Sequence, residues 1–389
     1  PGPLLTASVL LLSAMTIMAN ATIAPSLPGL REHYAAVPGI ETLAGLLLTV
    51  PSLAIVLAAG PVGWLADRID RQRLLVGSAL LYAVGGTSGL WVESLGAMLL
   101  GRLVLGFGVA GTMILATTWA ADLWHGAARE RYLGRQGAAI SLGGIVVTML
   151  GGLLASLHWR GAFATYLLVL PVTALALLTL APHARAHRER PRQEAGTGAR
   201  MPWRAFAFVG PLGFLFMVMF YVTPTRLPFH LEALGVGSPA VVAAVMAVMT
   251  VASLPGALLY GRIRRRLSVM AIFAITWAVM AVGVSIVALA PSAAVVALGV
   301  GVMGLGMGPS MPNYTAYWLA RVPPALRGRA SGLLTMAFFG GQFASPLATA
   351  PLVHWLGLWG AFEALAILQG VLALGLGVAA LRLRGREAG

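Results

Sequence analysis

The feature that most constrains this chain is a succession of about twelve apolar runs, each roughly 20 residues long. A helix of about 20 mostly apolar residues is what crosses the hydrocarbon core of a bilayer. Only 10% of the residues are charged, against about 25% in a typical soluble domain. We therefore predict an all-α membrane protein with twelve transmembrane helices. The spans are expected near residues 5–28, 43–64, 74–92, 97–119, 136–157, 162–182, 205–227, 238–259, 268–290, 294–318, 330–352 and 360–382.

The basic residues predict the orientation of these spans. All 26 are arginine, and 22 of them fall on the cytoplasmic side if both termini are cytoplasmic. Such an excess is typical of cytoplasmic loops. Arg31, Arg160 and Arg226 are assigned to the outer side, and Arg102 lies within a span. Because the arginines occur in short groups between spans, the formal charge of +14 indicates a lipid bilayer and no nucleic-acid partner. The absence of lysine suggests a GC-rich bacterial genome, so the expected location is the bacterial inner membrane.

An internal repeat divides the chain into two halves. Residues 129–134 (RERYLG) resemble residues 327–332 (RGRASG), 198 positions later. The same offset relates Gly101, Gly106 and Gly108 to Gly299, Gly304 and Gly306. We expect two pseudo-symmetric six-helix bundles with the same membrane orientation, at residues 1–182 and 205–389, joined by a cytoplasmic linker at 183–204. Two parallel halves with a substrate path between them are a known transporter architecture.

The loop after the second span carries the most specific motif, Gly63-Trp-Leu-Ala-Asp67-Arg68-Ile-Asp-Arg71-Gln-Arg. It resembles the loop signature of the major facilitator superfamily, and the resemblance covers essentially the whole chain. Asp67 ends a helix, where the helix dipole disfavours an anion. We therefore expect a conformational latch in which Gly63, Asp67, Arg68 and Arg71 meet Arg329 at the start of span 11. The alternative is a solvated loop anchored by arginines. The second-half copy has Gly261 in place of Asp67.

Candidate coupling residues follow from the same resemblance. Arg102, followed by Gly106 and Gly108, is similar to the superfamily's arginine motif in span 4, which implies a role in proton coupling. The alternative is that Arg102 extends outward to the membrane surface. A proton carrier is expected to be a buried carboxylate. The candidates are Glu363, about one turn into span 12, together with Asp122 and Asp67 at the cytoplasmic face. The histidines, for example His158 and His230, are expected near surfaces.

Polar residues and prolines in the spans predict the substrate cavity. Spans 1 and 7 occupy equivalent places in the two halves, and both are expected to be interrupted by proline, which is typical of a binding site. The alternative for each polar side chain is a hydrogen bond to a neighbouring helix. Methionine and aromatic side chains suit an amphiphilic organic molecule. The predicted cavity residues are Thr16, Asn20, Met113, Tyr221, Arg226, Asn313, Tyr314 and Gln342.

Taken together, these features predict a secondary transporter that moves a small organic molecule by alternating access, similar to twelve-span bacterial drug and metabolite efflux proteins. Proton-coupled efflux is the preferred reading, and uptake or uniport of a small metabolite is the alternative. Exporters of the superfamily usually have a Gly-Pro step in span 5, where this chain has Val147 and Thr148. No catalytic constellation lies in the spans, so the chain is not expected to be an enzyme. We expect no cofactor and no metal, protons as the candidate coupling ion, and a monomer.

Overall fold

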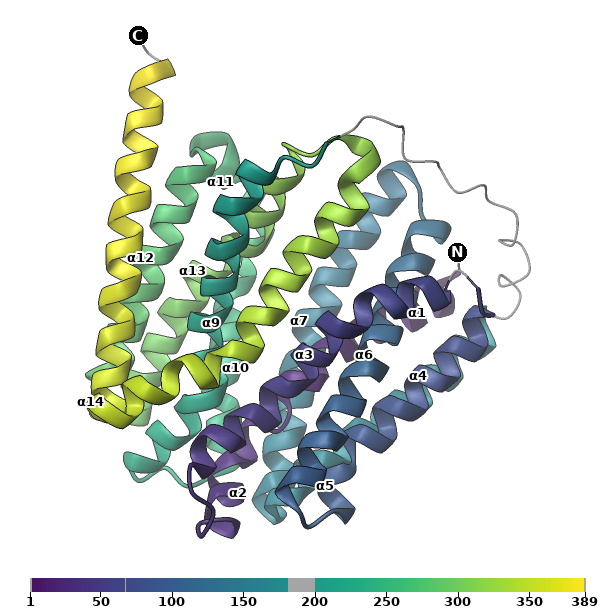
Figure 1. Ribbon diagram of the computed structural model, residues 1–389, viewed down its shortest axis with the longest axis vertical. Coiled ribbons are helices and arrows are strands. Elements are labelled where there is room, and N and C mark those ends of the chain that lie inside the picture. Colours follow the sequence, from purple (N-terminus) through teal and green to yellow (C-terminus); the bar gives the residue numbers. More distant parts are fainter. Residues whose placement is uncertain (1, 67, 181–199, 388–389) are drawn as a thin grey trace. The chain divides into compact units, whose positions relative to one another are not determined.

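The chain folds into helices (Figure 1). The computed structural model describes residues 2–66, 68–180 and 200–387, and the regular elements in these ranges are all helical. Most of the predicted linker, 183–204, lies outside the described residues, as does Asp67. The chain divides into two compact units, unit 1 at Pro1–Glu194 and unit 2 at Ala195–Gly389.

Each unit contains the helices of one predicted half. Unit 1 holds α1 (Pro3–Ala21), η1 (Ala24–Ser26), α2 (Leu27–His33), α3 (Ile40–Ala66), α4 (Arg71–Gly86), α5 (Ser88–Trp91), α6 (Leu95–Leu123), α7 (Gly126–Leu157), η2 (Trp159–Leu168) and α8 (Val169–Leu180). Unit 2 holds α9 (Trp203–Ala233), α10 (Pro239–Leu258), α11 (Tyr260–Arg266), α12 (Val269–Ala288), α13 (Ala293–Leu319), η4 (Pro324–Leu326) and α14 (Arg327–Glu387).

The helices account for the predicted spans. Ten segments of the described chain are long and apolar enough to cross a membrane. One of these, Arg327–Arg382, contains two predicted spans, because the helix bends at Gly357, where φ is 70°. Predicted span 74–92 corresponds to the 16-residue α4 followed by α5. The all-helical twelve-span fold is confirmed. Exposed leucines, such as Leu157 and Leu178, are expected on a surface that faces acyl chains.

Small residues let the central helix of each unit pack closely. In unit 1, α6 packs against α3 and α4; in unit 2, α13 packs against α10 and α12. A Cβ on Gly106 would lie closer than 3.0 Å to the Pro51 carbonyl oxygen, and a Cβ on Gly304 equally close to that of Met249. Each residue of the first contact stands 198 positions before its counterpart in the second. The repeat found in the sequence is therefore also a repeat of helix packing.

The expectation that spans 1 and 7 are interrupted alike is wrong. Helix α1 ends at Ala21 and is followed by the short η1 and α2, whereas α9 runs unbroken from Trp203 to Ala233 with three prolines inside it. Membrane helices tolerate proline where neighbouring helices satisfy the freed backbone groups. Just before the break in α1, side chains of other elements bond to its Ala19 carbonyl group, as described below.

Candidate functional site

The loop after α3 carries the predicted latch motif. Asp67 lies outside the described residues. The guanidinium carbon of Arg68 stands 4.0 Å from the centroid of the Trp64 ring, a cation–π contact at an exposed site. The Asp70 carboxylate accepts hydrogen bonds from the backbone N–H groups of Gln72 (3.0 Å) and Arg73 (3.1 Å). Asp70 therefore caps α4, and this cap orients the arginines that follow.

Arg71 is fixed by an ion pair within unit 1. Its Nη1 lies 2.6 Å from Oδ2 of Asp122, near the end of α6, and both side chains are partly buried. Two residues that sequence reasoning assigned to different roles, latch and coupling, are thus brought together. Gly63 lies in the last turn of α3, and Arg329 is exposed in the first turn of α14 in unit 2. The latch contact of Asp67 with Arg329 stays a prediction.

Arg102 of α6 is buried inside unit 1. Its side chain is 0% exposed, so the alternative of an arginine extending to the membrane surface is wrong. Nε donates to the Leu47 carbonyl of α3 at 2.7 Å, and Nη2 donates to the Ala19 carbonyl of α1 at 2.6 Å. The Tyr166 ring lies 4.8 Å from the guanidinium carbon. A charge this deep is costly, and charge-assisted bonds to carbonyl oxygens offset part of the penalty.

Tyrosine side chains also donate to carbonyl groups of α1. The Tyr166 hydroxyl also donates to the Ala19 carbonyl, at 3.2 Å, and the Tyr82 hydroxyl donates to that of Met15 at 2.8 Å. Arg102 and Tyr166 thus share a carbonyl group in the last turn of α1, just before η1 begins. Side chains from three elements of unit 1, α4, α6 and η2, therefore bond to carbonyl groups in the second half of α1.

The cavity residues predicted in unit 1 lie on α1 and α6. Thr16 and Met113 are half-buried, and the Asn20 side chain lies outside the described part of the chain. Thr16 stands within the last turns of α1, close in sequence to the break that Arg102 holds. Thr16 is three residues before Ala19, whose carbonyl group accepts from Arg102. The role of Thr16 as a substrate ligand stays a prediction.

The cavity residues predicted on α13 and α14 take part in the packing of unit 2. The Tyr314 hydroxyl donates to the Leu212 carbonyl at 3.2 Å. Asn313 accepts from the Tyr260 hydroxyl at 3.1 Å and donates to the Val269 carbonyl at 3.1 Å. Gln342 Nε2 lies 3.7 Å from the Met217 sulfur. These contacts match the alternative reading of hydrogen bonds between neighbouring helices.

Helix α9 carries a group of ionisable side chains that are buried inside unit 2. Arg226, assigned from the sequence to the outer side, is 2% exposed inside α9 and donates through Nη2 to the Pro346 carbonyl at 3.3 Å. Tyr221, one turn earlier, is also buried. His230 is 0% exposed and lies in the last turn of α9, so its expected place near a membrane surface stays a prediction. Helix α9 continues to Ala233, six residues past the predicted end of span 7 at 227.

The environment of His230 is aromatic. Its ring centroid lies 4.2 Å from that of Trp359 and 5.2 Å from that of Phe362, and Nε2 stands 2.9 Å from the Val287 carbonyl oxygen. Glu232, two residues on, has a buried Oε2 atom. Glu363, six residues after the bend in α14, is exposed on unit 2, and its place within the membrane stays a prediction. Sequence reasoning left His230 and Glu232 out of the site because both lie beyond residue 227, where the predicted span ended. A prediction that extended this helix by one and a half turns would have included them.

Comparisons with known proteins bear on the whole chain. A family model described as the Major Facilitator Superfamily matches residues 9–346 and 212–389. The chain is 27% identical to the class C tetracycline resistance protein of Escherichia coli over 205 residues, which are 51% of this chain and 50% of that protein. It is 28% identical to the bacillibactin exporter of Bacillus subtilis over 149 residues, 36% of each. The matched region thus spans half or less of the length of these relatives.

A solved structure extends the likeness to the full fold. The crystal structure of a D-xylose-proton symporter superposes with a TM-score of 0.74 at 17% identity, covering 96% of both chains. At this identity the likeness concerns the fold alone.

Proposed function

Because the chain belongs to the major facilitator superfamily, it is a multi-pass secondary transporter and not an enzyme, and we propose that it exports a small amphiphilic organic molecule in exchange for protons. The proposed location is the bacterial inner membrane, with both termini in the cytoplasm. The positions of 22 of the 26 arginines support this orientation. The mechanism is alternating access, in which two six-span halves rock about a central site.

The proposal that transport is directed outward is supported by the names of two similar proteins. One is named for resistance to tetracycline and another for export of bacillibactin. The second name describes export of an organic molecule, the first describes resistance to one, and both matches fall in the range of 27–28% identity. An amphiphilic substrate also fits the mixture of methionine and aromatic side chains predicted for the cavity.

Coupling requires a group whose proton occupancy differs between the two conformers, since a ligand shifts an equilibrium only by its differential affinity. Arg102 is the proposed coupling residue, because a buried cation that holds the end of α1 changes the electrostatic potential felt by any nearby acid. The latch proposed for Gly63, Asp67, Arg68, Arg71 and Arg329 closes the cytoplasmic side when the outer side is open.

A second candidate function is uniport or uptake of a small metabolite. It is favoured by one observation: among the side chains that the structure describes, no Asp or Glu is fully buried. Asp122 is paired with Arg71, and Glu363 is exposed. Without an acid that gains and loses a proton inside the spans, flux would follow the substrate gradient alone.

The experiment that separates these functions uses two assays. Expression in a bacterial strain lacking its own efflux pumps is expected to raise the inhibitory concentration of at least one amphiphilic antibiotic, with tetracycline and ethidium as the first probes. In proteoliposomes, transport of the active probe is expected to stop when an imposed pH gradient is collapsed. Flux that is unchanged without the gradient would reject antiport in favour of uniport. Resistance to no compound, from a chain shown to be in the membrane, would reject export.

A further inference from the structure

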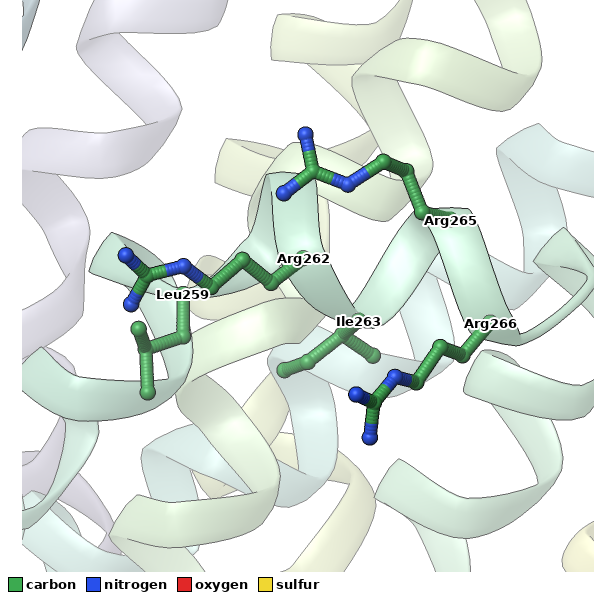
Figure 2. A pocket seen from close by; sticks show the side chains of 5 residues that line it. All are labelled: Leu259, Arg262, Ile263, Arg265 and Arg266. Carbon is green, nitrogen blue, oxygen red and sulfur yellow. The ribbon is translucent and has the colours of Figure 1, made fainter.

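A dense group of arginines follows α10 in unit 2. Helix α11 (Tyr260–Arg266) presents four of them, and all are exposed: Arg262, Arg264, Arg265 and Arg266. Figure 2 shows the side chains of Arg262, Arg265 and Arg266 extending to the same side in this view, with Ile263 between Arg262 and Arg266 and Leu259 below the end of Arg262. These five residues line a hollow of about 480 Å³. The four arginines and this hollow are named the α11 basic site.

The repeat shows what this site lacks. At an offset of 194, Arg68 and Arg71 of the first half correspond to Arg262 and Arg265. In the first half the arginines lie among acids, and Arg71 pairs with Asp122 at 2.6 Å.

Each of these acids is missing from the second half. Asp67 is replaced by Gly261 and Asp70 by Arg264, and at the packing offset of 198 Asp122 is replaced by Ala320. Among the residues described by the structure, no carboxylate lies within 4.0 Å of the α11 arginines; Arg264 bonds only to the Leu267 carbonyl, at 3.1 Å. The second copy therefore holds concentrated positive charge without the counter-ions that the first copy has.

The apolar neighbours of the arginines restrict the partner. Leu258, the last residue of α10, is 75% exposed, and Leu259 is 40% exposed. Helix α10 is itself apolar enough to cross a membrane. Arginine clusters that directly follow a membrane span are attracted to anionic headgroups. Exposed leucines next to the guanidinium groups suit acyl chains, which a free phosphate ion does not have.

We propose that the α11 basic site binds the phosphate of an anionic phospholipid, with Arg262, Arg265 and Arg266 around the headgroup and Leu258 and Leu259 against its acyl chains. Guanidinium groups are well matched to phosphate oxygens because they donate paired hydrogen bonds. The proposal depends on α10 being a membrane span and is independent of the substrate and of the direction of transport.

Native mass spectrometry of the full chain in mild detergent tests the proposal. The probe is dioleoyl phosphatidylglycerol, with dioleoyl phosphatidylcholine as the neutral lipid. The test variant replaces Arg262, Arg265 and Arg266 with Gln and keeps Arg264, which bonds to its own backbone. The control variant replaces three exposed arginines of unit 1 with Gln: Arg73, Arg129 and Arg135. Both variants lose three positive charges. Thermal unfolding of each variant checks that it remains folded.

The test variant is expected to bind the first phosphatidylglycerol molecule at least about tenfold more weakly than the native chain, with phosphatidylcholine unaffected. The control variant is expected to bind phosphatidylglycerol less than about twofold more weakly than the native chain. An equal loss of phosphatidylglycerol affinity in the two variants would show that binding depends only on net charge, and it would overturn the proposal. An unchanged affinity in the test variant would overturn it as well. Displacement of the lipid by inorganic phosphate at equal concentration would assign the site to free phosphate instead. None of these outcomes depends on transport.

Discussion

The Nη2 atom of Arg102 lies 2.6 Å from the carbonyl oxygen of Ala19, so a buried cation on α6 holds the last turn of α1. Through Nε, the same guanidinium group bonds to the Leu47 carbonyl of α3. One side chain therefore ties three helices of unit 1 at the point where α1 breaks. In the second half the position equivalent to Arg102 is Val300, which is equally buried. The two halves share their packing and differ at this charge.

Replacing Arg102 is expected to impair coupling. Arg102→Ala removes both carbonyl bonds and leaves the Ala19 and Leu47 oxygens with fewer donors, so the unfolding temperature should fall and the transport rate should drop at least about tenfold. Arg102→Lys keeps the charge, but a single ammonium group does not reproduce the planar two-carbonyl geometry, so we expect intermediate loss. Proteoliposome flux at several probe concentrations measures rate and affinity separately.

The matched control is Tyr166→Phe, which removes one bond to the Ala19 carbonyl and leaves the guanidinium in place. It is expected to cost about 1 kcal/mol of stability and to leave the response to the pH gradient intact. A change confined to substrate affinity in Arg102→Ala, with unaltered gradient dependence, would contradict the coupling role.

The close packing of glycines predicts equal sensitivity in the two units. Gly106→Ala and Gly304→Ala each place a methyl group closer than 3.0 Å to a backbone carbonyl of the neighbouring helix. Overpacking of this kind costs about 1–3 kcal/mol, so both variants should unfold at lower temperature. Gly137→Ala, on α7 with no atom within 4 Å of the added Cβ, is the control. It is expected to be neutral or slightly stabilising. If Gly106→Ala or Gly304→Ala were as stable as the native chain, the helices would be able to move apart around the added methyl group without loss of stability.

Much of the fold could be predicted from the sequence, because length and apolarity of a run largely decide whether it spans a bilayer. The internal repeat could be predicted equally well, since Gly106 and Gly304 are separated by 198 positions, as are the residues that they contact. The ends of helices were harder to predict. The proline-rich stretch around Pro224 and Pro228 resembles a break, yet α9 continues through it.

The candidate site was only partly accessible to sequence reasoning. The loop signature pointed to Arg71, but its pairing with Asp122 joins residues 51 positions apart and depends on how α4 meets α6. The buried Arg102 bonds to carbonyl groups of α1 and α3, and a sequence does not reveal which carbonyl groups lie within reach of its guanidinium group. The burial of His230 could not be predicted, because it depends on how far α9 continues past residue 227.

The bend in α14 predicts a glycine requirement. Gly357 has a φ of 70° and a ψ of 177°, a region that is essentially restricted to glycine and costs about 1–3 kcal/mol for another residue. Gly357→Ala and Gly357→Asn are both expected to lower the unfolding temperature, since any side chain is strained in this region. Gly370→Ala, further along α14 in open surroundings, is the control. Thermal unfolding in detergent measures all three. Identical stability of Gly357→Ala and Gly370→Ala would mean that the bend relaxes freely.

The two acids of the loop after α3 are expected to separate transport from stability. Asp70 caps α4 through the N–H groups of Gln72 and Arg73, so Asp70→Ala should cost about 1 kcal/mol of stability, while Asp70→Ser keeps an acceptor oxygen and should be close to native in stability.

Asp67→Asn is expected to reduce transport at least about fivefold at native expression and unfolding temperature, because the proposed latch needs the charge. Drug resistance and thermal unfolding are measured on the same variants. Native transport by Asp67→Asn would remove the latch, and loss of stability in it would reassign Asp67 to a structural role.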